Sequence, residues 1–328
     1  MTDVGRPAGL EELYGPVLGD MPRVEAAILE VGNVPVPWLS TLVKHVLGQT
    51  GKRMRPAMTL LAGKFGDYNL DVMVPMAASV ELLHTASLVH DDTLDEASLR
   101  RGNPTVNQLW NKNVAVLFGD YVFAAAAEMV SRTSNVRVMR LFAQTLRIIC
   151  DGELAQNFAA YQWDAGRDQY FQRIGGKTAS LFSMATESGA ALSGLPEPQV
   201  QALKRYGHSL GMAFQVADDI LDFTGEETAM GKAVGGDLIQ GTVTLPAIML
   251  VERDARGNAV RRYLEGGRTA EDLNAVLRAV RESDVIERCY EVANGFRVEA
   301  CQALAGFPAA AARACLERLT EYALARRS

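Results

Sequence analysis

Apolar positions recur at helical spacing along most of this chain. Between Val136 and Gln156 they fall 3, 4, 7, 8 and 11 positions after the first, at Val138, Leu141, Phe142, Thr145, Leu146 and Ile149. This is the period of an amphipathic helix. The first six residues of the segment alternate as a strand would, but the longer repeat favours a helix.

Two further segments show the same period. One runs from about Asp71 to Asp95, where Pro75 is tolerated near the first turns, and the other from Ala270 to Leu304. Segments that break helices separate the periodic blocks: "GNVPVP", "GKFGDYN", "SGLPEP", "RDARGN" and "LEGGRT". None is long or low in complexity, and no short repeat is present. We therefore expect one all-α domain over residues 1–328.

Composition narrows the class of protein. With 328 residues, 48% of them apolar, the chain can form a large core. A net charge of -6 argues against nucleic acid as a partner. The four cysteines show no CxxC spacing, which predicts reduced core thiols.

The chain shows no membrane or export signal. No basic segment followed by an apolar run begins it, and no apolar run approaches the ~20 residues that span a bilayer. We expect a cytoplasmic protein without signal peptide or transmembrane segment, compatible with transient membrane contact.

The most charged stretch is "HDDTLDEASLRRG", residues 90–102. On a helix Asp91 and Asp95 project from one face, where like charges cost about 0.2–0.5 kcal/mol. A cation would offset that cost, and hard oxygen ligands suit Mg²⁺ bound together with a phosphate. Among 39 acidic residues the motif alone is weak, since it could equally be a solvated helix surface.

The same spacing occurs a second time. "QVADDILDFTG" supplies Asp218, Asp219 and Asp222, and both copies follow apolar helical segments, where unpaired charge is costly. The repetition favours a shared metal site over a solvated surface.

Basic residues cluster near these motifs, and their side chains suit phosphate oxygens. "GGKT" does not complete a P-loop, because Phe171 occupies the position of the required glycine. The clusters comprise Lys52, Arg53 and Arg55, then Arg100 and Arg101, then Lys177 with Thr178, and finally Lys232.

Seven blocks in order resemble the all-trans isoprenyl diphosphate synthases (polyprenyl synthetases), from about Gly51 to Pro246. The resemblance implies a bundle of long antiparallel helices around a central cavity. The blocks are "GKRMRP", "ELLHTASLVHDDTLDEASLRRG", "FGDYVFA", "GE" at 152–153 with Gln156, "GGKTASLF", "GMAFQVADDILDFTG" and "GKAVGGDL".

The resemblance also implies roles for single residues. About three Mg²⁺ ions would bind the allylic diphosphate, held by Asp91, Asp92, Asp95, Asp218, Asp219 and Asp222. The further allylic diphosphate ligands would be Arg100, Lys177, Thr178, Gln215 and Lys232. Isopentenyl diphosphate would bind Lys52, Arg55, His84 and Arg101. The catalytic residues would be Asp91, Asp95, Lys177 and Asp218.

The implied reaction is a 1'-4 head-to-tail condensation that lengthens an all-trans prenyl chain. Mg²⁺, Lys and Arg stabilise negative charge on the leaving diphosphate. The double bond of isopentenyl diphosphate attacks the allylic cation, a proton is then lost, and the released diphosphate is the expected base. No protein nucleophile is needed.

Position along the helices separates one candidate ligand, His84, from the other three histidines. His84 lies seven residues before Asp91, about two turns, and so shares its face with Asp91 and Asp95. That shared face and the matched block favour a ligand over a core histidine. His45, His90 and His208 are interpreted as structural.

Product length depends on residues before the first motif, by the same resemblance. Ala86 and Ser87 are small, which favours a product longer than farnesyl, although ordinary helix packing also explains them. Phe142 is the candidate floor of the prenyl tunnel, with core packing as its alternative. Farnesyl or geranylgeranyl diphosphate synthase stays open.

Two rival functions share the first motif. A class I terpene cyclase usually carries Ser or Thr at the position of Asp222 and needs no isopentenyl diphosphate site. A non-catalytic subunit of a heteromeric synthase normally lacks an aspartate motif, whereas this chain keeps both. The resemblance further implies a homodimer.

Overall fold

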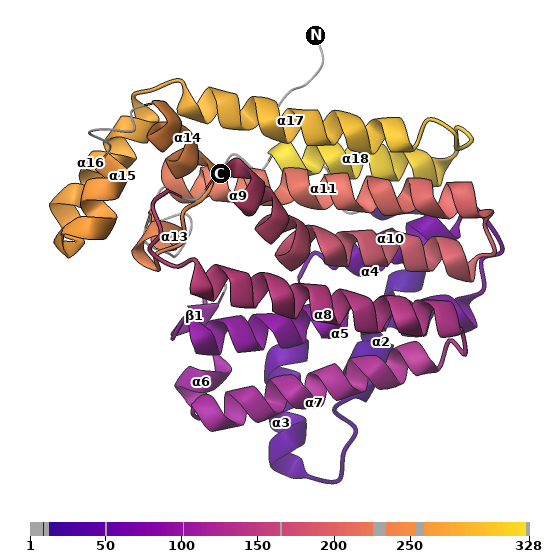
Figure 1. Ribbon diagram of the computed structural model, residues 1–328. Coiled ribbons are helices and arrows are strands. Elements are labelled where there is room, and N and C mark those ends of the chain that lie inside the picture. Colours follow the sequence, from indigo (N-terminus) through magenta and orange to yellow (C-terminus); the bar gives the residue numbers. More distant parts are fainter. Residues whose placement is uncertain are drawn as a thin grey trace. The chain divides into compact units, whose positions relative to one another are not determined.

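The fold is helical nearly throughout (Figure 1). The computed structural model describes residues 9, 13–49, 51–100, 102–164, 166–225, 234–253 and 259–325. Within these residues the strands are two antiparallel pieces, β1 (Leu99–Arg100) and β2 (Asn103–Pro104). The all-α prediction is confirmed.

Most helices are long. Up to residue 158 they are η1 (Gly15–Asp20), α2 (Met21–Glu30), α3 (Pro37–Leu47), α4 (Met54–Gly63), α5 (Leu70–Leu94), α6 (Val106–Leu109), α7 (Lys112–Ser131) and α8 (Val136–Phe158). Beyond it they are α9 (Arg167–Ile174), η2 (Gly175–Ala179), α10 (Ser180–Leu192), α11 (Glu197–Thr224), α13 (Gly236–Ile239), α14 (Leu245–Arg253), α15 (Ala259–Arg262), η3 (Tyr263–Gly267), α16 (Ala270–Arg281), α17 (Val285–Ala303) and α18 (Ala311–Ala325).

The predicted helices and their ends agree with this order. Helix α5 starts at Leu70, where the Asn69 side chain accepts a hydrogen bond from the Asp71 N–H and so caps the first turn. In α8 the predicted face is buried at Val138, Phe142, Thr145 and Ile149. Three of the predicted breaking segments, "GNVPVP", "GKFGDYN" and "SGLPEP", lie where one helix ends and the next begins, and "LEGGRT" runs from η3 to the start of α16. Most of "RDARGN" lies outside the described residues.

The chain divides into two compact units, each described by itself. The first comprises 1–146, 181–207 and 303–319, and the second 147–180, 208–302 and 320–328. The boundaries run through α8, α10, α11, α17 and α18, so the single domain stays a prediction.

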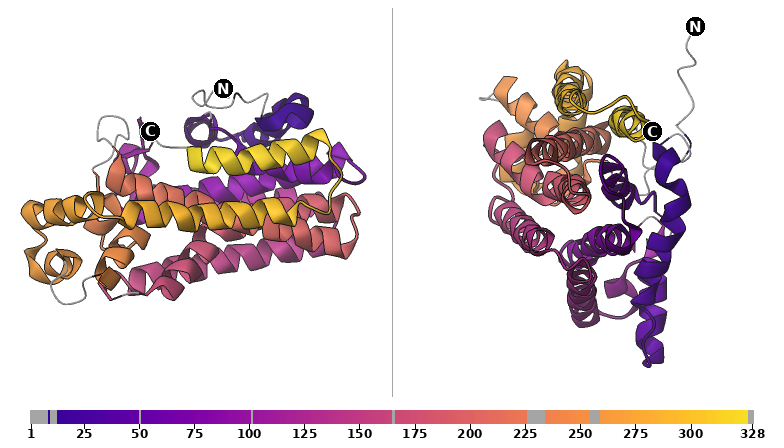
Figure 2. Two further views of the ribbon diagram at one scale, coloured as in Figure 1. Left: turned by 90° about the horizontal axis from the view of Figure 1, so that it is seen from above. Right: turned by 90° about the vertical axis from the view of Figure 1, so that its right-hand side faces the viewer.

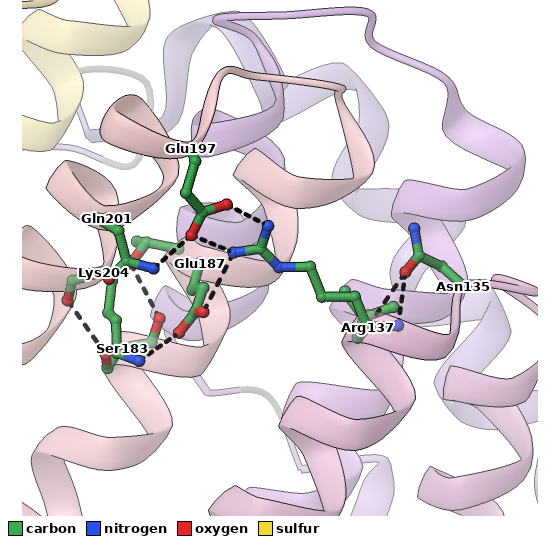
Figure 3. A network of polar contacts seen from close by, with 9 residues as sticks. Asn135, Arg137, Ser183, Glu187, Glu197, Gln201 and Lys204 are labelled. Carbon is green, nitrogen blue, oxygen red and sulfur yellow. Dashed lines mark hydrogen bonds and ion pairs between the residues drawn. The ribbon is translucent and has the colours of Figure 1, made fainter.

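In the first unit, α5 packs against α7, α4 and α2. Figures 1 and 2 show α5 and α7 running alongside each other. A polar network also joins α8, α10 and α11 here (Figure 3): Arg137 pairs with Glu197 at 2.5 Å and Glu187 at 3.7 Å, and Lys204 lies 3.2 Å from Glu187.

The second unit has its own apolar core. Side chains of α9, α11, α14, α16 and α17 form it, including Tyr170, Ile220 and Cys289. All four cysteines are free. The core-thiol prediction is confirmed for Cys289 and Cys315, but it is wrong for Cys150, which is exposed.

Two helices among the described residues, α5 and α7, are long and apolar enough to cross a bilayer. In each helix an 18-residue window has a mean hydropathy of 1.5. The α5 window is 61% buried inside the protein, and the α7 window is 39% buried. Core helices of soluble proteins pass the same test, so this is weak support for a membrane span. The absence of a transmembrane segment stays a prediction.

Candidate functional site

The first aspartate motif lies at the C-terminal end of α5. Asp91 and Asp92 belong to its last turns, and Asp95 is the C-cap, whose N–H donates to the Asp91 carbonyl at 2.8 Å. Asp92 is buried, whereas Asp95 is exposed. The carboxylates are therefore held on helical backbone at the end of an apolar helix.

Arg100 pairs with Asp92. Its Nε donates to both carboxylate oxygens, at 2.8 and 2.7 Å, and its Nη2 lies 2.7 Å from Oδ1. Burial lowers the pKa of Arg100, but the hydrogen bond and charge of Asp92, with the charges of Asp91 and Asp95, outweigh burial and raise it. The structure thus brings a predicted diphosphate ligand into the field of all three aspartates.

Glu96 is the remaining carboxylate of this stretch. Its side chain pairs with Lys112 at the surface, and this contact lowers the pKa of Glu96. Its backbone is left-handed, with φ at 52°. Glu96 therefore forms a surface ion pair after the helix end.

The residues predicted to bind isopentenyl diphosphate lie in the same unit. Lys52 and Arg55 flank the start of α4, and the Arg55 guanidinium lies 4.3 Å from the centre of the buried Phe182 ring. Arg101 lies outside the described residues. A cavity of about 60 Å³ brings predicted residues together, since its lining includes His84, Asp92 and Arg100, together with His45, Gln49 and Arg53.

The predicted chain-length residues are also in the first unit. Ala86 is fully buried, and the Ser87 hydroxyl donates to the His84 carbonyl at 2.8 Å. Phe142 is buried in α8. Their roles in product length stay predictions. His45 and His90 contact the carbonyls of Pro104 and Val116. Their structural role also stays a prediction.

The second aspartate motif lies near the C-terminal end of α11, in the second unit. Asp219 is 3% exposed and accepts hydrogen bonds from the Tyr170 hydroxyl at 2.7 Å and the Gln215 side chain at 2.8 Å. The Thr178 hydroxyl donates to the Gln215 carbonyl oxygen at 2.7 Å. Three predicted site residues, Thr178, Gln215 and Asp219, therefore form one chain of hydrogen bonds.

Asp222 is held by backbone. Its carboxylate accepts from the N–H groups of Gly236 at 3.0 Å and Asp237 at 3.3 Å, at the start of α13. Asp218 is exposed on the same helix. Lys232 lies outside the described residues.

Lys177 and Thr178 lie in a π-helical turn, η2, between α9 and α10. Such turns occur frequently at functional sites. The Lys177 ammonium lies 2.6 Å from the Glu153 carboxylate of α8. Lys177 and Thr178, the ligands predicted from "GGKT", therefore lie in an irregular helical turn and not in a P-loop.

The sequence assigned no role to Tyr170 or Glu153, and it placed Arg53 only within a basic cluster suited to phosphate. Each of the three contacts or adjoins predicted ligands. No spacing in the sequence pointed to Tyr170, because it reaches Asp219 from another helix. In the sequence, Glu153 stood out only as part of "GE" at 152–153, one of the seven blocks that carry the family resemblance.

The carboxylates fit a divalent metal by their chemistry. Among the described residues, three or more His, Cys, Asp or Glu side chains are nowhere gathered as a ready metal site. Burial, followed by the charge of Asp237, raises the pKa of Asp219, and Asp218 adds to it. Negative charge concentrated on oxygen ligands is what Mg²⁺ or Ca²⁺ would compensate.

Comparisons with known proteins agree with this chemistry. The family model described as "Polyprenyl synthetase" matches residues 36–282. The chain is 38% identical over 313 residues to "Heptaprenyl diphosphate synthase component 2" of Geobacillus stearothermophilus, covering 95% of this chain and 98% of that protein. It is 38% identical over 319 residues to "All-trans-nonaprenyl-diphosphate synthase (geranyl-diphosphate specific)" of Rhodobacter capsulatus, covering 96% and 98%.

A solved structure is similarly close. The polyprenyl synthase from Caulobacter crescentus CB15, complexed with calcium and isoprenyl diphosphate, matches with a TM-score of 0.91 and 32% identity. The match covers 99% of this chain and 100% of that one.

Proposed function

This chain belongs to the polyprenyl synthetase family, and from that premise we propose its substrates, ligands and product. It is a trans-prenyltransferase that makes a medium- or long-chain polyprenyl diphosphate. In our proposal it condenses isopentenyl diphosphate with an allylic prenyl diphosphate, 1'-4 and head to tail. The observation that carries this is the Arg100–Asp92 pair at a cavity also lined by His84.

Arg100 would bind the allylic diphosphate. Its guanidinium is already oriented by two carboxylate oxygens of Asp92. A planar fork suits phosphate as well as carboxylate. Arg100 would therefore bind the leaving group, and Asp91, Asp92 and Asp95 would hold a cation.

Lys177, Thr178 and Gln215 are the further proposed ligands of the allylic diphosphate. The Lys177 ammonium is a mobile point charge that can leave Glu153 for a phosphate oxygen. The Thr178 hydroxyl can likewise change its acceptor from Gln215 to phosphate. These donors stabilise charge that develops as the allylic C–O bond breaks.

Mg²⁺ is the proposed metal, with about three ions per site. When bound, it would supply Lewis-acid stabilisation of the diphosphate. The similar Caulobacter enzyme was crystallised with calcium and isoprenyl diphosphate, which supports a divalent cation. The proposed ligands are Asp91, Asp92, Asp95, Asp218, Asp219 and Asp222.

The proposed product lies between heptaprenyl and nonaprenyl diphosphate. The names of two similar enzymes support this range, as does the small Ala86 before the first motif. Farnesyl or geranylgeranyl diphosphate is the alternative product. Phe142 is proposed as the floor that limits the chain.

Product analysis tests the reaction. The purified chain is incubated with Mg²⁺, labelled isopentenyl diphosphate and allylic starters of increasing length, and products are separated by chromatography. We expect label in a ladder that ends between heptaprenyl and nonaprenyl. No incorporation of label would contradict the proposal, and a ladder ending at geranylgeranyl would replace the product.

Phe142→Ala should lengthen that ladder, because the substitution removes a buried ring. The same chromatography measures it. An unchanged distribution in a folded variant would assign Phe142 to core packing.

A second candidate function is a subunit that needs a partner chain. It is favoured by one similar protein, which is named component 2 of its enzyme. Both aspartate motifs of this chain argue for catalysis by the chain itself. Activity of the purified chain alone distinguishes the two.

We further propose a cytoplasmic homodimer. Helix α7 supports the dimer, since it is apolar yet exposes Val116 and Leu117. Transient membrane contact would serve release of a long prenyl product.

A further inference from the structure

Arg53 lies between two residues proposed to bind isopentenyl diphosphate, Lys52 and Arg55. Its charge suggests a third phosphate ligand, yet its guanidinium is committed to protein. Nε donates to Glu25 at 2.7 Å, Nη1 to Glu81 at 2.9 Å, and Nη2 to Glu25 and to the carbonyls of Leu47 and Gln49. Each of the three nitrogens therefore has a protein acceptor.

The Arg53 side chain is almost fully enclosed. It is 9% exposed, as is Glu81, while Glu25 is 37% exposed. Burial lowers the pKa of Arg53, but its contacts with Glu25 and Glu81 outweigh burial and raise it. A charge held in this way cannot move to a substrate without leaving a buried glutamate unpaired.

The backbone at Arg53 is unusual as well. Its φ of 48° and ψ of 39° are left-handed, a conformation that L-residues other than Asn, Asp and Gly rarely adopt. Arg53 is the N-cap of α4, so this conformation sets the direction in which the chain enters the helix. Lys52 precedes that turn and Arg55 follows it.

A neighbouring contact fixes the same turn. The Tyr14 hydroxyl, on a side chain that is 2% exposed, donates to the Lys52 carbonyl at 2.5 Å. Tyr14, Glu25 of α2 and Glu81 of α5 therefore all contact the two consecutive residues Lys52 and Arg53. Arg53 also lines the cavity that His84 lines.

We propose that Arg53 is a positioning residue for isopentenyl diphosphate: its ion pairs with Glu25 and Glu81 hold a left-handed turn that presents Lys52 and Arg55 to this substrate. The inference rests on the proposed function for the identity of the substrate. Loss of the turn weakens binding of isopentenyl diphosphate and leaves the allylic diphosphate site intact.

The test variant is Arg53→Lys. Lysine keeps the charge and has the same backbone preferences, but its single nitrogen cannot reach both glutamates and both carbonyls as the guanidinium fork does. We expect the KM for isopentenyl diphosphate to rise between about tenfold and a hundredfold, with the KM for the allylic substrate unchanged.

The chain offers a matched control in the network of Figure 3. Arg137 also bridges a buried and an exposed glutamate, Glu187 and Glu197, in the same unit. Arg137→Lys should lower the melting temperature without changing either KM. If Arg53→Lys raises both KM values together, or neither, Arg53 is structural and the inference is wrong.

Tyr14→Phe keeps the inference testable if Arg53→Lys does not fold. It removes only the hydroxyl bonded to Lys52, and it should raise the same KM by a smaller factor. An unchanged KM in folded Tyr14→Phe would overturn the inference.

Calorimetry with isopentenyl diphosphate alone separates the two proposals. Wild-type protein that binds this ligand but does not turn over contradicts the proposed function, and the affinities of the variants still test Arg53. Wild-type protein that does not bind it overturns both.

Discussion

The carboxylate of Asp219, one of the proposed metal ligands, is fixed by its surroundings. The carboxylate is buried, and two side-chain donors, Tyr170 and Gln215, fix its orientation. Groups that orient ligands from outside commonly change metal affinity when they are replaced. Tyr170 is the simpler donor to remove, because phenylalanine fills the same space.

Tyr170→Phe should raise the Mg²⁺ concentration needed for half-maximal activity by about tenfold or more. It should also lower the free energy of unfolding by about 1–3 kcal/mol, because Asp219 loses a buried partner. Mg²⁺ titration and thermal denaturation measure the two effects.

Tyr206→Phe is the control for this prediction. Tyr206 is similarly buried, and its hydroxyl donates to the backbone carbonyl of Leu316 at 2.7 Å. It should lower stability to a similar degree and leave the Mg²⁺ titration unchanged. A shift of the titration in both variants would assign the effect to stability alone.

Cysteine reactivity is a second prediction at the residue scale. Burial, followed by the charge of Asp219, raises the pKa of Cys289 to about 12, so this thiol stays protonated and enclosed. Cys150 is exposed as a residue, but partial enclosure of its thiol, followed by the charges of Asp151 and Glu153, raises its pKa. Only thiolates react with alkylating reagents.

In native protein, iodoacetamide should therefore modify Cys150 before Cys289, and faster at about pH 9 than at about pH 7. Peptide mass spectrometry after timed quenching measures this, with denatured protein as the control for full reactivity. Modification of Cys289 at the rate of Cys150 would contradict the burial of Cys289.

Among the elements, the π-helical turn η2 depends on a close approach to α8. A Cβ added at Gly152 would lie 3.0 Å from the Lys177 backbone nitrogen, and one added at Gly176 would lie 3.3 Å from the Ile148 carbonyl oxygen. Backbone atoms cannot yield as a flexible side chain would. Small residues at both positions therefore set the position of Lys177 and Thr178.

Gly152→Ala should displace η2 by a few tenths of an ångström and lower kcat, by less than the roughly hundredfold that a shift of about 1 Å costs. Circular dichroism should show unchanged helix content. Gly295→Ala in α17 is the control, since no atom lies within 4 Å of its added Cβ. That variant should be more stable by roughly 0.5–1 kcal/mol and fully active.

Helices of the fold were predictable from sequence where one apolar period continued for many turns. The spacing from Val138 to Ile149 identified α8, and that from Asp71 to Asp95 identified α5. The π-helical turn was not predictable, because a single i→i+5 turn leaves no mark on the apolar spacing. The sequence showed glycines before Lys177 but not which backbone they approach.

For the candidate site, too, some residues could be predicted from sequence and others could not. Repeated aspartates at one spacing could be found from sequence, because a helix places i and i+4 together. Partners from other elements could not, since Tyr170 reaches Asp219 and Glu153 reaches Lys177 only through tertiary packing. The charge of Arg53 suggested a phosphate ligand, and its enclosure by Glu25 and Glu81, which the sequence did not reveal, is the basis of the positioning role proposed above.

At the scale of the whole molecule, α7 is apolar but incompletely covered. Its most apolar window is 39% buried, against 61% in α5, and Leu117 is 68% exposed. A second copy of the chain would cover this face, as the proposed homodimer requires. Burying a leucine contributes about 1.5–3 kcal/mol, so one substitution there can weaken association measurably.

Leu117→Lys should therefore shift the protein from dimer toward monomer, measured by light scattering across a dilution series without detergent. Lysine at an exposed position leaves the fold of the monomer intact. Val298→Lys in α17, at a residue that is 36% exposed, is the control and should remain dimeric. A wild-type monomer, or wild-type protein that needs detergent to stay in solution, would mean that α7 serves another purpose, with a membrane as its partner in the second case.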